Sequence, residues 1–167
     1  MLNQEQLTTI INLQRELDNK IITTRSVSES STLTARFLAL LVELAEFANE
    51  QRCFKYWSSK PSSAKNVMLE EYIDGLHFII SIANSLNINF KKYHFIEQDN
   101  EVELTLLFIS LFASVTTFFT SKTNENFYQL LNFYFSIAKR CEFTNNDIIS
   151  SYLTKNKINH LRQSQNY

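Results

Sequence analysis

The sequence ELAEFANEQRCFKYW, at residues 43–57, places a row of carboxylates along a segment with helical spacing. Glu43, Glu46 and Glu50 follow Ala39 at steps of four, three and four residues, so all of them lie on one helix face. Two apolar residues, Ala35 and Val42, border the same face. An acidic stripe next to apolar side chains is unusual, but one such stripe alone is more often a solvated surface than a site.

Helical spacing extends along most of the chain. The 167 residues include one glycine and one proline, so few positions can interrupt a helix. Apolar periodicity and turn residues predict five or six helices, at about 4–22, 33–57, 64–86, 102–120, 126–141 and 148–163. No segment alternates at the period of a strand, and residues 87–100 are ambiguous. We expect one all-α domain over residues 1–167, a helical bundle with a central antiparallel helix pair.

The overall composition excludes several classes of protein. A net charge of -1 provides no general attraction to nucleic acid or to an anionic membrane. The most apolar run, residues 104–119, is shorter than the ~20 residues needed to span a bilayer. Cys53 and Cys141 are not closely spaced, and the first residues lack a signal-peptide pattern. We therefore expect a reduced, cytoplasmic protein.

A second acidic pair lies on the following helix. Val67, Glu71, Asp74 and Phe78 share a face there, so two acids interrupt an apolar line. The midpoint between Glu43, Glu46 and this second pair falls in the loop at residues 57–61. In an antiparallel hairpin, residues at equal distance from the turn face each other, here roughly 19 Å along each helix. Four carboxylates are therefore expected to converge.

Converging carboxylates repel each other unless they are protonated or bind cations. A ligand set made only of oxygen atoms selects Mg²⁺, Mn²⁺ or Ca²⁺ rather than zinc. Mg²⁺ bound in this way usually also contacts substrate phosphate. Two other interpretations stay open: two solvated acidic faces, or a di-iron site using Asp74 and His77, although His94 and His160 lack the matching acid.

Polar side chains also lie on the apolar stripes of the last and first helices. In the last helix, Ile148 and Tyr152 are followed on the same side by Lys155, Asn159 and Arg162, with Asn156 and Gln163 beside them. Such cationic and amide groups suit a triphosphate. In the first helix, Gln14 falls between apolar residues, and its amide offers the donor and acceptor that a uracil edge requires. Trp57, His77 and Asn49 are further candidates for contact with a base.

Three motifs in order resemble a known family. They are ELAEFANEQRCFKYW followed by KPSS, then LEEYIDGLHF, and finally YLTKNKINHLRQ. Together they resemble the dimeric, all-α dUTP pyrophosphatases of phages and some bacteria, within the all-α NTP pyrophosphatase superfamily. The similarity is collinear from about Leu13 to the C-terminus.

The resemblance implies hydrolysis of dUTP, and of dUDP, to dUMP with two or more Mg²⁺ ions, for which Mn²⁺ is a substitute. It implies metal binding by Glu43, Glu46, Glu71 and Asp74, with Glu43 or Glu46 acting on the attacking water. It assigns the uracil and deoxyribose to Gln14, Asn49, Trp57 and His77, and the phosphates to Lys155, Asn156, Asn159, Arg162 and Gln163.

The resemblance also implies a homodimer, for which the helix at 104–119 is our candidate surface, and no contact with nucleic acid or membrane. Some phage members are bound by the repressor of a mobile element, and this partner stays open here. Residues 87–135 carry no motif of the family that we can align. Two other functions remain as alternatives: a nucleotide pyrophosphatase of broader specificity, and a non-enzymatic interaction module such as a repressor-binding protein.

Overall fold

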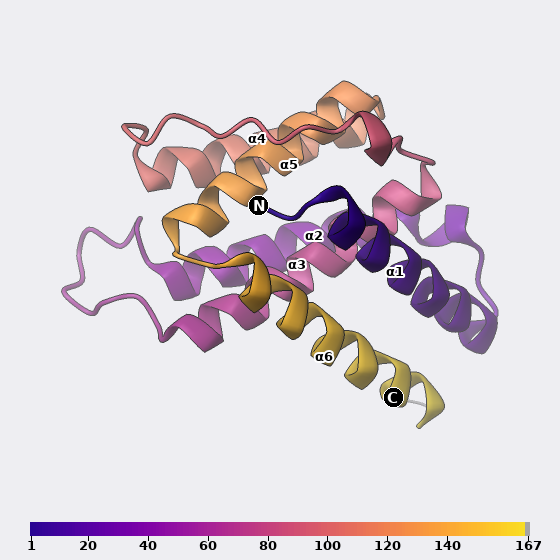
Figure 1. The fold of residues 1–167 in the computed structure, drawn as a ribbon. Helices are drawn as coiled ribbons and strands as arrows, with labels where there is room; N and C mark the ends of the chain where they lie inside the picture. The colour runs from indigo at the N-terminus through magenta and orange to yellow at the C-terminus, as the bar shows by residue number, and fades with distance from the viewer. Residues whose placement is uncertain (166–167) are drawn as a thin grey trace.

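The computed structural model describes residues 1–165. These residues contain six α-helices and one short 3-10 helix. They are α1 (Gln4–Arg25), α2 (Glu29–Gln51), α3 (Lys65–Ser85), η1 (Phe90–Lys92), α4 (Leu104–Thr120), α5 (Asn124–Arg140) and α6 (Asn145–Ser164). These residues contain no strand, so the predicted all-α bundle is confirmed. The helices pack as the pairs α2 with α3, α4 with α5 and α1 with α6, and α3 also contacts α1 and α6 (Figure 1).

The central pair is the antiparallel hairpin of α2 and α3. Phe47 of α2 packs against Tyr72 of α3 with ring centroids 5.6 Å apart, and both side chains are fully buried. The connecting loop, residues 52–64, is held closed at its base by Ser63. The Ser63 N–H donates to the Glu50 carbonyl at 2.9 Å, and the Ser63 hydroxyl donates to the Glu50 carboxylate. Glu50 therefore has a structural partner in the loop.

Close packing between helices depends on the only glycine of the chain, Gly75 in α3. A Cβ atom at this position would lie 3.0 Å from the Tyr134 hydroxyl oxygen and 3.5 Å from a methyl carbon of Leu44. Tyr134 donates a hydrogen bond from that hydroxyl to the Tyr72 carbonyl, and the two tyrosine rings stack at 4.3 Å. Gly75 thus allows α2, α3 and α5 to approach each other immediately beside Asp74.

The helix boundaries differ from the predictions at several ends. We predicted that the second helix begins after residues 30–32, but it begins at Glu29. The Ser28 side chain accepts a hydrogen bond from the Ser31 N–H at 3.1 Å, and the Ser28 N–H donates to the Ser31 hydroxyl at 3.1 Å. Several adjacent serines can cap a helix equally well, so propensity alone does not select the start. α1 continues to Arg25, three residues further than predicted, and ends at Ser26 with φ 53°.

The ambiguous segment after α3 forms η1 and then an extended stretch along α5. The Ile96 N–H donates to the Asn132 side-chain oxygen at 3.0 Å, and the Gln98 N–H donates to the Ser136 hydroxyl at 2.9 Å. Asn132 and Ser136 are both buried on α5. Polar side chains of a helix therefore satisfy backbone groups that a strand partner would otherwise satisfy.

The acidic faces are less enclosed than the sequence suggested. We took Ala35, Val42 and Val67 as signs of an inward face, but all three are exposed, Val42 to 46% and Val67 to 38%. The inward faces of α2 and α3 instead carry a separate set of buried residues: Leu40, Leu44, Phe47, Tyr72, Ile73 and Leu76. The acids lie at the border between this core and solvent. No helix among the described residues combines the length and apolar character that crossing a membrane requires.

Candidate active site

Three carboxylates meet where α2 and α3 run side by side. Glu43, Glu46 and Glu71 each offer an oxygen atom, and these oxygens lie within 4.8 Å of one another. We call these three residues the carboxylate cluster. Glu43 and Glu71 are half-buried and Glu46 is exposed, so the cluster is open on one side. The two helices reach this arrangement because the acids are equally far from the loop that joins them.

Burial and repulsion between carboxylates raise the pKa values of two residues of the cluster, Glu43 and Glu71. Burial, followed by the negative charges of Asp74, Glu46 and Glu71, raises the pKa of Glu43 to about 7. Burial and the charge of Glu46 also raise the pKa of Glu71. The site therefore favours positive charge, whether a proton or a cation. A ligand set made only of oxygen atoms, partly open to solvent, fits Mg²⁺ or Mn²⁺.

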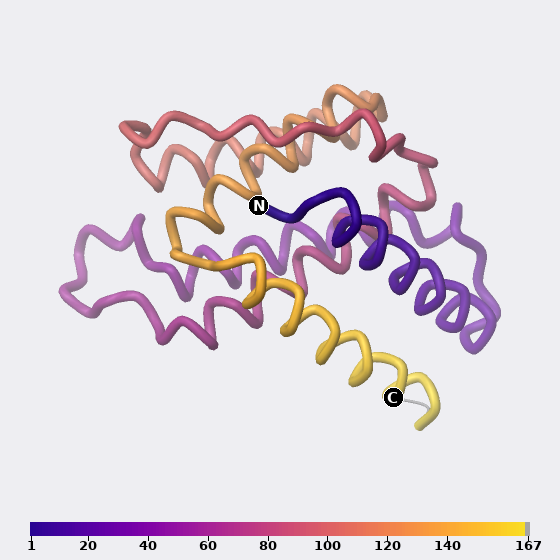
Figure 2. Tube along the Cα trace, in the orientation of Figure 1, coloured from indigo at the N-terminus to yellow at the C-terminus, as the bar shows by residue number. Residues whose placement is uncertain are grey.

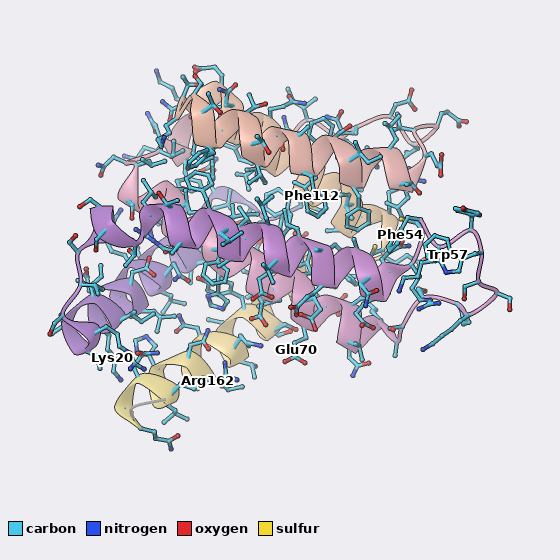
Figure 3. All side chains as sticks on the ribbon, turned by 180° about the vertical axis from the view of Figure 1, so that it is seen from behind. Lys20, Phe54, Trp57, Glu70, Phe112 and Arg162 are labelled. Atoms are coloured by element: carbon cyan, nitrogen blue, oxygen red, sulfur yellow. The ribbon has the colours of Figure 1, made fainter. Side chains whose placement is uncertain are left out.

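Asp74 lies beside the cluster but has a different partner. Its Oδ2 accepts a hydrogen bond from the Lys155 Nζ at 2.6 Å, and the same ammonium group lies 3.1 Å from the Glu70 carboxylate. The Lys155 side chain is 13% exposed and comes from α6 (the labelled Glu70 and the adjacent α6 are visible in Figure 3). Burial raises the pKa of Asp74, and the hydrogen bond from Lys155 opposes this shift. The lysine thus neutralises part of the acidic site.

A pocket of about 380 Å³ opens next to the cluster. Its walls come from α1, α2, α3 and α6, and Figure 2 shows the first and last of these on the same side of the α2–α3 pair. Glu43 and Asp74 line one end, and Asn159 and Arg162 of α6 line the pocket as well. The Arg162 guanidinium donates to the Asn159 side-chain oxygen at 3.4 Å. Carboxylates and a guanidinium group therefore share one cavity.

Gln14 and His77 line the same pocket in a defined hydrogen-bond network. The Gln14 Oε1 accepts from the Tyr152 hydroxyl at 2.8 Å and lies 2.7 Å from the His77 Nδ1. Because an amide oxygen only accepts, Nδ1 must carry the proton of a neutral imidazole. Burial lowers the pKa of His77 to about 3, so the ring is neutral at physiological pH. The His77 Nε2 has no hydrogen-bond partner within the described residues.

Two polar residues of this pocket were missed in the sequence, Asp18 and Arg36. Asp18 is 8% exposed, and its Oδ1 accepts from the Gln14 Nε2 at 2.8 Å. Arg36 of α2 donates to the Ser81 hydroxyl at 2.9 Å and to the Ser85 hydroxyl at 2.7 Å. The signal for Asp18 was present, because it follows Gln14 by four residues on one helix face. Nothing in the local sequence distinguishes Arg36.

The remaining predicted residues do not line the pocket. Asn156 is buried, and its amide donates to the Leu13 carbonyl at 3.5 Å, a contact between α6 and α1. Gln163 is half-buried near the end of α6. Asn49 is exposed and accepts a hydrogen bond from Lys55. Trp57 is 65% exposed at the tip of the α2–α3 loop, well separated from Arg162 in Figure 3. Neither Asn49 nor Trp57 lines the pocket.

The fold and this site define a class: an all-α protein in which an acidic cluster adjoins a pocket with both polar and apolar walls. A protein-family model described as dUTPase matches residues 6–167, nearly the whole chain. The chain therefore belongs to the dUTPase family, as an all-helical member, and it is a dUTP diphosphatase. Family membership implies a nucleotide substrate and a divalent metal. No curated protein matches the sequence.

Proposed function

We propose that the chain hydrolyses dUTP, and also dUDP, to dUMP with Mg²⁺, and that Mn²⁺ can substitute. The observation that carries this proposal is the carboxylate cluster, with three side chains whose oxygens lie within 4.8 Å of one another, one of which, Glu43, also lines a pocket. In dUTP hydrolysis, water attacks the phosphate chain, and pyrophosphate leaves as dUMP is released.

Glu43, Glu46 and Glu71 would hold the metal ions, and Asp74 would join them by exchanging Lys155 for a cation. When bound, Mg²⁺ supplies positive charge against the phosphate oxygens and favours deprotonation of the attacking water. We assign the orientation of that water, and acceptance of its proton, to Glu43 or Glu46. The pKa of Glu43, raised to about 7 by burial and by the neighbouring carboxylates in the absence of metal, supports the binding of positive charge beside it.

The phosphates are assigned to Lys155, Asn159 and Arg162, which supply donors and positive charge beside the acidic end of the pocket. Lys155 would leave Asp74 for a phosphate oxygen when the metal arrives. Asn156 and Gln163 stay in the proposal as residues that hold α6 in place rather than as direct ligands, in view of the contact between Asn156 and α1.

The nucleoside is assigned to the inner part of the pocket, at Gln14 and His77. Asn49 and Trp57 remain candidates whose contact with the base requires the α2–α3 loop to approach the pocket, or a second copy of the chain to provide it. Substitution of Trp57 by alanine tests this: a raised KM for dUTP supports contact, and unchanged kinetics remove Trp57 from the site.

The decisive experiment measures pyrophosphate released from dUTP, dCTP and dTTP with Mg²⁺, with Mn²⁺ and with EDTA, and phosphate released from dUDP. Selective, metal-dependent turnover of dUTP supports the proposal. Equal turnover of all three triphosphates would identify a broader nucleotide pyrophosphatase. Turnover that persists in EDTA would contradict the role of the carboxylate cluster.

We propose a homodimer that acts on the nucleotide pool of the cytoplasm. Support comes from exposed apolar side chains on α2 and α4, two helices that contact each other: Leu38 is 64% exposed and Ile109 is 60% exposed. Exposed apolar surface is a common feature of protein interfaces. Light scattering after size-exclusion chromatography tests the proposal, with Leu38→Glu expected to give monomers and a wild-type monomer contradicting it.

A further inference from the structure

The hydrogen bonds of Gln14 limit what its amide can offer a ligand. Both lone pairs of the Gln14 Oε1 are used, one by the Tyr152 hydroxyl and one by the His77 Nδ1–H. One N–H of the Gln14 Nε2 is directed to Asp18, which leaves a single donor. Gln14 can therefore give a base one hydrogen bond as a donor, and it cannot accept one.

A uracil ring needs an acceptor as well as donors from the protein. Its N3–H donates, and the carbonyl oxygens on either side accept. Cytosine presents a lone pair at N3 instead of a hydrogen atom. An enzyme that selects uracil over cytosine by hydrogen bonding must therefore place an acceptor opposite N3. Since Gln14 has none to give, another side chain of the pocket has to supply it.

The remaining polar side chains of α3 lie at different heights along the helix, which indicates the part of the nucleotide that each can contact. Asp74, His77 and Ser81 follow each other on the face that lines the pocket. Ser81 hydrogen bonds to Asp18 and lies about 10 Å along the helix from Asp74, at 1.5 Å per residue. If the phosphate chain lies at the carboxylate cluster, the sugar lies near His77 and the base lies near Asp18. The lone pair of the His77 Nε2 then suits a sugar hydroxyl.

We propose that Asp18 reads the base: its carboxylate accepts the N3–H of uracil, while the free N–H of Gln14 donates to an adjacent carbonyl oxygen. This inference rests on the proposed function, because it takes a deoxyuridine nucleotide as the ligand. A carboxylate has about four lone-pair sites, and the hydrogen bonds from Gln14 and Ser81 occupy two of them. Asp18 lines the pocket, so an acceptor remains for the base.

Arg36 favours the ionised form of the Asp18 carboxylate, which is the form that accepts hydrogen bonds without donating one. Its guanidinium is anchored by the Glu29 carbonyl at 2.7 Å and by Ser81 and Ser85. Burial raises the pKa of Asp18, and the hydrogen bonds from Gln14 and Ser81, followed by the positive charge of Arg36, oppose this shift. Arg36 is therefore a positioning residue, which acts on the base through Asp18. A negative carboxylate opposite the N3 lone pair of cytosine is repulsive, so the same group also rejects the wrong base.

The test compares Asp18→Asn with Glu16→Gln, an exposed residue on the same helix that also loses one negative charge. In Asp18→Asn, the new side-chain oxygen accepts the hydrogen bond from the Gln14 N–H. The new amide NH₂ then faces the base and can donate to the N3 lone pair of cytosine. We expect the ratio of kcat/KM for dUTP over dCTP to fall about 100-fold. The ratio for dUTP over dTTP should not change, because thymine has the same N3–H. Glu16→Gln should change neither ratio.

A binding measurement separates this inference from the proposed function. By calorimetry, wild-type protein should bind dUMP far better than dCMP or 3-methyl-dUMP, which lacks the N3–H, and this requires no variant to fold. Binding of 3-methyl-dUMP as tight as that of dUMP would overturn the role of Asp18 even if dUTP is hydrolysed. If Asp18→Asn is merely less stable and keeps its base preference, Asp18 is a structural buried carboxylate and the inference fails. Selective dUMP binding without hydrolysis would overturn the proposed function alone.

Discussion

Lys155 reaches from α6 to Asp74 on α3, with 2.6 Å between the Nζ and the Oδ2, although 81 positions separate the two residues in the sequence. This ion pair keeps Asp74 out of the group of carboxylates formed by Glu43, Glu46 and Glu71. It also brings the helix that carries the candidate phosphate ligands into contact with the acidic site. One lysine thereby links the two halves of the proposed chemistry.

Replacing Lys155 by glutamine is expected to lower kcat/KM for dUTP by about 100-fold, the usual effect of removing one group that stabilises transition-state charge. The neutral side chain would still reach Asp74 but would not neutralise it. Initial-rate kinetics with saturating Mg²⁺ check this. Lys157→Gln, at an exposed position of the same helix, is the control. Equal losses in the two variants would argue for general electrostatics instead of a defined contact.

Replacing Glu71 by glutamine should reduce activity by at least about 100-fold while the fold is retained. Wild-type protein should gain thermal stability when Mg²⁺ is added, by mass action, and the variant should lose this gain. Circular dichroism melts with Mg²⁺ and with EDTA measure both effects. Glu125→Gln, an exposed acid on α5, should behave like wild type. A fully active Glu71→Gln protein would remove Glu71 from the metal site.

The contribution of Glu43 to the stability of the metal-free protein should become less favourable as pH rises from 5 to 8. The pKa of Glu43 is about 7 in the folded protein against an ordinary value of 4.5, so in this interval the folded state binds a proton that the unfolded state has released. Unfolding then becomes easier with increasing pH. Glu43→Gln removes this dependence and should be more stable than wild type at pH 8, by on the order of 1 kcal/mol after screening by solvent.

Urea denaturation in EDTA at both pH values measures the difference between Glu43→Gln and wild type. His77 contributes in the opposite direction, since its pKa is lowered to about 3, but it does so equally in both proteins and cancels in the comparison. The two proteins should be nearly equal at pH 5. A constant difference across the pH range would show that Glu43 does not titrate within it.

Gly75→Ala should destabilise the protein by about 1–3 kcal/mol, because the added methyl group meets the Tyr134 hydroxyl oxygen at 3.0 Å. Alanine gains helix propensity of about 1 kcal/mol, which offsets part of this cost. Urea denaturation measures the sum. Adding Tyr134→Phe removes the hydroxyl and should recover part of the loss, so the double variant should be more stable than the two single effects predict. An alanine variant as stable as wild type would mean that the helices can separate slightly.

The sequence was sufficient to predict the fold class and the approach of Glu71 to Glu43 and Glu46, although Asp74 of the predicted four carboxylates lies outside the cluster. In an antiparallel hairpin, the number of residues between a side chain and the loop determines which residues of the other helix it faces. Acids that are equally far from the loop therefore lie at the same level, as Glu43, Glu46 and Glu71 do. The burial of Gln14 likewise followed from its place on an apolar stripe. These predictions succeeded because each depends on spacing within one helix or across one loop.

Features that depend on distant parts of the chain were not predictable. The partner of Asp74 lies on α6, and the groups that hold residues 93–98 are Asn132 and Ser136 on α5. Helical periodicity reports on which side of a helix is buried but not on which helix covers it. The exposure of Val42 and Val67 was misjudged for the same reason, since the local pattern cannot distinguish the core from an outer apolar surface.

The pocket also has a consequence for synthesis of the protein. The end proposed here to bind the base is built on α1, and α6 forms another wall of the pocket; Gln14 and Tyr152, which are in contact, are 138 positions apart. Contacts between residues this distant form late in folding. While the ribosome is still producing the middle of the chain, Gln14 has no partner from α6 and α1 can cover only part of α3. Nucleotide can therefore be captured only by a nearly finished chain, and C-terminal truncation should abolish binding before it abolishes helix content.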